Sequence, residues 1–158
     1  MFKKIVLQEG VTLYIRKTEQ FKTVNFSVKW KTVLDEKKAA QRAVLANILQ
    51  DSNGRYPTQT EFRNKLDELY GTVLYTDAAK RGETHIVSLY AECVNEEYLS
   101  EGGVLDDVLG LLHTTIFEPN LVDGQFDKTI VNREKRSVKE RIRSLYDDKT
   151  RYAQKRML

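Results

Sequence analysis

Hydrophobic and polar residues alternate strictly over residues 24–33, and this pattern predicts a β-strand that packs on one face and meets solvent on the other. The packed face would carry Val24, Phe26, Val28, Trp30 and Thr32. Earlier in the chain, an apolar run at 4–7 and an alternating run at 11–16 flank Gln8-Glu9-Gly10. Two short runs around such a turn predict a β-hairpin, because glycine adopts the positive φ that the turn requires.

Apolar residues at helical spacing predict a helix from about 36 to 50, with the stripe Ala40, Val44, Leu45, Ile48 and Leu49. A second helix is expected to start after Pro57 and to stop at Gly71. Thr58 and Glu61 have the spacing of a capping box, in which each side chain binds a free N–H of the first turn. Two more strands are predicted at 72–77 and 84–92.

Two further helices are predicted, one at about 104–114 and a long, highly charged one at about 123–145. Glu134 interrupts the apolar stripe of the long helix, which consists of Phe126, Ile130, Val138, Ile142 and Leu145. Residues 152–158 stay helix-like and show no cap or stop signal. We therefore expect the chain to be C-terminally incomplete.

The order of these elements is β-β-β-α-α-β-β-α-α, without the strand–helix alternation of a parallel sheet. This order predicts the α+β class, with an antiparallel sheet and helices packed on one of its faces. No linker or internal repeat interrupts residues 1–158, which predicts a single domain.

The overall charge is mild, since 26 basic and 23 acidic residues leave a net charge of +3. The helix at 123–145 is nevertheless rich in cations, namely Lys128, Arg133, Lys135, Arg136, Lys139, Arg141 and Arg143. These cations form either a solvated outer face or a surface that docks an acidic partner. No aromatic residues interleave with them, so we expect no nucleic-acid partner. No apolar run approaches the roughly 20 residues of a membrane span, so we expect a cytoplasmic protein without a membrane partner.

Few residues carry obvious chemistry. Cys93 is the single cysteine, which excludes an intrachain disulfide and is typical of a small buried residue at a strand end. His85 and His113 are the only histidines, and neither has a second histidine or a cysteine nearby in sequence. Zinc requires three or four clustered ligands, so we expect both to be partly exposed structural residues.

Several local strings resemble one half of a pitrilysin/insulinase-type (M16) zinc peptidase. They are Leu7-Gln8-Glu9-Gly10-Val11-Thr12-Leu13, Tyr56-Pro57-Thr58, Phe62 with Leu66-Asp67-Glu68-Leu69-Tyr70-Gly71, and Asn132-Arg133-Glu134-Lys135. The helix at 36–50 takes the place of the family's zinc helix. The resemblance implies that residues 1–158 form an N-terminal half-domain of an M16-like α/β sandwich.

The resemblance breaks where the family has its metal motif, H-x-x-E-H, in which two histidines hold zinc and the glutamate activates water. Here Ala43 and Asn47 take the places of the histidines, and Ala46 takes the place of the glutamate. The family's third ligand, a glutamate, would fall on Arg141, whose charge repels zinc. We therefore expect no catalytic residue, no metal ligand and no cofactor in this chain.

The resemblance also implies a substrate-pairing edge strand, which corresponds to residues 72–77. The family's Asn-Ala pair appears here as Tyr75-Thr76, and an extended peptide could add to this strand as a further β-strand. Tyr75, Thr76 and Arg141 are therefore the candidate substrate-binding residues, with Arg141 holding acidic groups of a peptide. The alternative for Tyr75 is that its ring only packs.

The sequence is most similar to a bacterial subgroup of the family that lacks the metal motif, through Lys139-Glu140-Arg141-Ile142 and Tyr146-Asp147-Asp148-Lys149-Thr150-Arg151-Tyr152-Ala153. That resemblance implies a non-catalytic subunit without activity of its own. It would form a peptide-binding chamber with a paralogous, zinc-bearing partner or second half. Two alternatives stay open: a fragment of a zinc peptidase whose site lies in a missing half, and an unrelated basic α+β interaction module.

Overall fold

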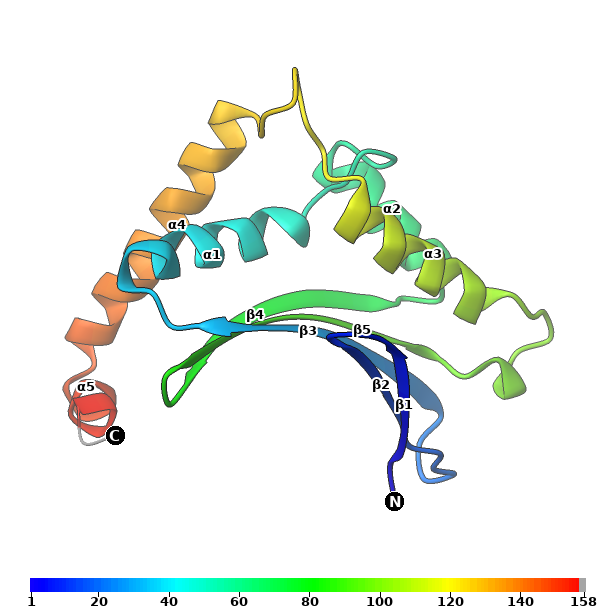
Figure 1. The fold of residues 1–158 in the computed structure, drawn as a ribbon. Coiled ribbons are helices and arrows are strands. Elements are labelled where there is room, and N and C mark those ends of the chain that lie inside the picture. Colours follow the sequence, from blue (N-terminus) through cyan, green and yellow to red (C-terminus); the bar gives the residue numbers. More distant parts are fainter. Residues whose placement is uncertain (157–158) are drawn as a thin grey trace.

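A three-stranded antiparallel sheet in the order β3-β5-β4 forms the centre of the fold (Figure 1). The computed structural model describes residues 1–156, without the side chains of Leu145, Arg151, Lys155 and Arg156. The sheet strands are β3 (Thr23–Val33), β4 (Val73–Arg81) and β5 (Thr84–Val94). The first two strands, β1 (Lys3–Gln8) and β2 (Val11–Ile15), form a separate two-stranded sheet next to the beginning of β3.

The helices are α1 (Glu36–Leu49), α2 (Gln59–Glu68), α3 (Val104–Phe117), α4 (Lys128–Asp147) and α5 (Lys149–Arg156), with a short 3-10 turn at Glu96–Tyr98. Helices α1, α2 and α3 cover one face of the central sheet, and α4 crosses α1 and continues past it (Figure 1). The α+β class, the antiparallel pairing and the single helical face are thereby confirmed. The alternation of residues did not indicate that the hairpin forms a sheet of its own.

The hydrophobic core lies between the central sheet and helices α2 and α3. Phe62 of α2, Leu89 of β5 and Val108 of α3 are almost completely buried there. Burying side chains of this size contributes roughly 1.5–3 kcal/mol each. Cys93 is 2% exposed near the end of β5, so the prediction of a small buried residue at a strand end is confirmed.

Local signals set the starts of α2 and α4. The capping box is present, since Thr58 accepts the N–H of Glu61 and donates to its carboxylate. The bonds that the Thr58 hydroxyl and the Thr58 backbone N–H donate to the Glu61 carboxylate lower the pKa of Glu61. The long helix starts at Lys128 and not near 123, because the Asp127 carboxylate accepts the N–H groups of Thr129 and Ile130. The same two backbone bonds lower the pKa of Asp127.

The distal part of α4 differs from the sequence prediction. Val138 is buried, but Ile142 is 47% exposed, so the apolar stripe does not pack along its whole length. The side chain of Leu145 lies outside the described part of the structure, as do residues 157 and 158 of the predicted helical end. Across residues 1–156, no helix combines the length and the apolar character that a membrane crossing requires.

Candidate functional site

Residues 43–47, which the resemblance compares with the metal motif, lie on α1, where this helix packs on β4 and α4. Asp35 starts the helix by accepting the N–H of Lys37. Ala46 is 2% exposed and Asn47 is 9% exposed, whereas Ala43 is partly exposed. The last two positions of the segment are therefore part of the packed interior.

Thr76 attaches α1 to the edge strand β4. Its hydroxyl donates to the backbone carbonyl of Ala46 at 2.8 Å, and its backbone N–H donates to Gln50 Oε1 at 3.2 Å. The second bond occupies a donor on the outer edge of β4, where an added peptide strand would otherwise pair. In this structure the edge at Thr76 is joined to α1.

Tyr75 points to the opposite face of β4, because neighbouring residues of a strand alternate. Its ring stacks on Tyr90 with 4.8 Å between centroids, and Lys29 Nζ lies 5.4 Å from the Tyr90 ring centroid. Tyr75 remains 47% exposed on the face of the sheet that the helices leave open. The Tyr75 ring both packs on Tyr90 and stays accessible, so its position fits a peptide contact as well as a purely structural role.

Arg141 is exposed on α4, two turns beyond the buried Glu134. Among the described residues, no side-chain hydrogen bond or ion pair joins Arg141 to Tyr75 or Thr76. The structure thus separates the three predicted substrate contacts: one on the open face of the sheet, one beneath α1 and one on the surface of α4.

A cluster that sequence reasoning missed joins α4 to the turn that follows α1. Arg133 donates through Nε to Glu134 at 2.7 Å and through Nη2 to Asp51 at 2.6 Å. The hydrogen bond that Arg133 donates to Glu134, followed by the negative charge of Asp51, raises the pKa of Arg133 against the opposing effect of burial. Glu134 is only 7% exposed. The signal was present in the sequence, since a carboxylate at a stripe position needs a cation beside it.

The prediction that His85 is partly exposed is wrong, since this residue is 5% exposed. Arg42 of α1 donates to His85 Nδ1 at 3.2 Å and to the carbonyl of Val33 at 3.1 Å, so the ring is enclosed by helix and sheet. His113 is exposed and lies 4.0 Å from Glu118. Within the described residues, no group of three or more His, Cys, Asp or Glu side chains is arranged to hold a metal ion. The methyl and amide groups on α1 do not fit zinc.

Comparisons with known proteins identify longer relatives. No family model matches the chain. A protein of Bacillus subtilis (strain 168), "Probable inactive metalloprotease YmfF", is 38% identical over 150 residues, which cover 94% of this chain and 35% of that protein. A solved structure, "Crystal structure of a conserved protein from Enterococcus faecalis V583", superposes with a TM-score of 0.91 at 31% identity, over 97% of this chain and 36% of that one. This chain therefore spans about a third of the length of each.

Proposed function

We propose that this chain is a non-catalytic, M16 metallopeptidase-like half-domain. Its role is to associate with a paralogous subunit that carries zinc, and to complete a chamber that encloses peptides. The hydrolytic chemistry then belongs to the partner. The chain contributes shape, docking surface and contacts that position substrate.

The observation that carries this proposal is the contact between Ala46 and Thr76. At the position where a peptidase of this type needs a base to activate water, a buried methyl group lies beside a carbonyl that accepts the Thr76 hydroxyl. Neither group takes up a proton at neutral pH or binds a divalent cation. The place of the catalytic centre is used for packing α1 on β4.

The relatives support the same proposal. The Bacillus subtilis protein is described by name as an inactive metalloprotease, and that name covers the whole protein, including the part outside the match. This favours an inactive protein over the alternative in which a missing half holds the zinc site. The close structural match over 97% of this chain supports the same fold for the corresponding third of a longer polypeptide.

Substrate positioning is assigned to two exposed features. Tyr75 offers an accessible ring on the open face of the sheet, and the cations of α4, including Arg141, offer hydrogen-bond donors for acidic groups of a peptide. Pairing of a peptide along β4 would have to bypass Thr76, because Gln50 holds its edge N–H. We therefore assign peptide contact to side chains more than to strand addition on β4.

The test is metal analysis of the purified chain together with a peptidase assay on a quenched fluorescent peptide library. The assay is run with the chain alone, with the nearest encoded paralogue that carries H-x-x-E-H, and with both together. The expected results are no stoichiometric zinc, no hydrolysis by the chain alone, and co-purification with the paralogue. Stoichiometric zinc that is lost on substituting a residue of this chain would overturn the non-catalytic assignment. Failure to associate with the paralogue would overturn the partner assignment.

A further inference from the structure

The backbone of β3 has one edge that no described strand covers. Thr76 directs its N–H away from β5, toward Gln50, so its neighbour Tyr75 directs its backbone groups toward Tyr90 of β5. The N–H and C=O groups of Tyr90 therefore point to β4 and away from β3. Its partner on β3 is Ser27, so the N–H and C=O groups of Ser27 point away from β5.

The same alternation applies to Asn25, two residues before Ser27. The hydrogen bond from the Asn95 N–H to the Lys22 carbonyl agrees with this alternation, because it shows that the backbone groups of an even-numbered residue in this region point toward the β5 side. The N–H and C=O groups of Asn25 and Ser27 therefore point outward from the sheet. Within residues 1–156, β3 has β5 as its single sheet neighbour.

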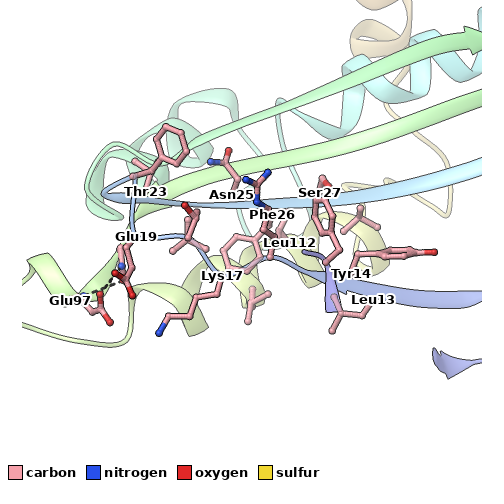
Figure 2. A pocket seen from close by; sticks show the side chains of 18 of the residues that line it. Leu13, Tyr14, Lys17, Glu19, Thr23, Asn25, Phe26, Ser27, Glu97 and Leu112 are labelled. Atoms are coloured by element: carbon pink, nitrogen blue, oxygen red, sulfur yellow. Dashed lines mark hydrogen bonds between the residues drawn. The ribbon is translucent and has the colours of Figure 1, made fainter. Parts of the chain in front are cut away.

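A cleft of about 750 Å³ lies against this edge. Figure 2 shows Asn25, Phe26 and Ser27 of β3 along one side, Leu13 and Tyr14 of β2 along another, and Leu112 of α3 between them. Consecutive residues of β3 line the cleft, as expected when a cleft runs beside a strand edge and not over one face. The hairpin and the central sheet thus form the two sides of one slot.

The walls of this slot are apolar and accessible. Four of its hydrophobic side chains expose between 41% and 62% of their surface: Phe2, Leu13, Phe21 and Leu109. The charged lining residues balance, with Arg16 and Lys17 against Glu19 and Glu97. Outward backbone groups beside apolar side chains and a neutral charge balance suit an extended strand with alternating apolar residues.

We propose that the slot between β2 and β3 is an acceptor site for a β-strand, which pairs with Asn25 and Ser27 and buries its apolar side chains against Leu13 and Leu109. The occupant is a strand from the polypeptide that makes up the remaining length of the relatives. The match to the Enterococcus faecalis structure covers 97% of this chain but 36% of that one, so the same fold exists there beside additional polypeptide. This proposal goes beyond the non-catalytic role and does not depend on it.

The test uses the full chain and overlapping synthetic peptides that tile the unmatched part of the Bacillus subtilis relative. Binding is measured by fluorescence anisotropy, and amide hydrogen exchange is recorded residue by residue. One peptide is expected to bind and to slow exchange at Asn25 and Ser27 by about tenfold or more. Absence of binding by every peptide, or binding that leaves these two amides unchanged, would overturn the proposal.

Three variants separate strand pairing from general apolar adhesion. Ser27→Pro removes an N–H that faces the slot but takes no part in the ladder to β5, so affinity is expected to fall about tenfold. Lys31→Pro is the matched control, because its N–H also points outward from β3 and it does not line the slot. Leu109→Asp places a charge in the slot without altering the sheet, and it should weaken binding as well.

A second copy of the chain is the competing occupant. Analytical ultracentrifugation over a range of concentrations distinguishes the two sources. A dimer whose formation protects Asn25 and Ser27 would overturn the assignment of the donor strand to the remaining polypeptide. Failure of strand capture would leave the metal and peptidase results untouched, so this proposal and the proposed function fail separately.

Discussion

The hydroxyl of Thr76 donates to the backbone carbonyl of Ala46, at 2.8 Å, and fixes the middle of α1 on the edge strand β4. One residue of this pair takes the place of a catalytic glutamate, and the other takes the place of a substrate-pairing position in the family that the sequence resembles. In this chain both residues contribute to the packing of α1 on β4.

The first prediction concerns the stability that this hydrogen bond supplies. Thr76→Val keeps the shape of the side chain but removes the donor, so the buried carbonyl of Ala46 loses a partner. We expect the free energy of unfolding to fall by about 1 kcal/mol in urea denaturation. Thr76→Ser retains the hydroxyl and is the control. A Thr76→Val protein as stable as the wild type, with the loss confined to Thr76→Ser, would show that the methyl group, and not the hydrogen bond, stabilises this contact.

The second prediction concerns the position of the missing base. Ala46 is 2% exposed, so Ala46→Glu buries a carboxylate without a cation beside it, and we expect a loss of more than about 2 kcal/mol in unfolding free energy. Leu45→Glu is the matched control on the neighbouring residue of the same helix, which is 39% exposed. It should cost less than about 1 kcal/mol. An Ala46→Glu protein as stable as the Leu45→Glu protein would contradict the packed role of this position.

The local parts of the fold could be predicted from sequence, because their causes lie within a few residues. Alternation along 24–33 identified the packed positions Val24 and Phe26, and the spacing of Thr58 and Glu61 identified a helix start. Trp30 is an exception, since it shares that packed face yet remains 40% exposed. Its position is decided by what packs above the strand, and alternation does not encode that.

The parts that were missed depend on residues far apart in the chain. Arg133 and Asp51 are separated by 82 positions, and no periodicity within α4 indicates their contact. His85 is buried because Arg42, from a helix 43 positions earlier, lies over it. The assignment of Ala43, Ala46 and Asn47 to one helix followed from local spacing. Their packing against α4 and β4 required the tertiary structure.

The third prediction concerns the cluster between α4 and the turn that follows α1. Arg133→Ala leaves the carboxylate of Glu134 buried without its donor, and we expect a loss of about 2 kcal/mol, allowing for solvent screening of the half-exposed guanidinium. The double variant Arg133→Ala/Glu134→Leu should recover most of this loss, since it removes the unpaired charge. Arg136→Ala, an exposed cation on the same helix, is the control. A double variant no more stable than Arg133→Ala would mean that Glu134 is not the source of the penalty. Urea denaturation of all four proteins measures these differences.

The fourth prediction concerns Cys93 and alkaline pH. Burial, followed by the negative charges of Glu96 and Glu92, raises the pKa of the Cys93 thiol above its ordinary value of 9.0. The folded state therefore holds this proton more tightly than the unfolded state. The resulting stability is fully present below pH 9.0 and is lost as the pH rises through the folded pKa. Relative to Cys93→Ala, the wild-type chain should lose unfolding free energy between about pH 9 and 11, and the stability curves of the two proteins should run parallel below pH 8.

The Cys93 thiol should also react slowly with iodoacetamide at pH 9 in the folded protein and rapidly in urea. Fast alkylation of the folded chain, or stability curves that stay parallel up to pH 11, would contradict a shielded thiol.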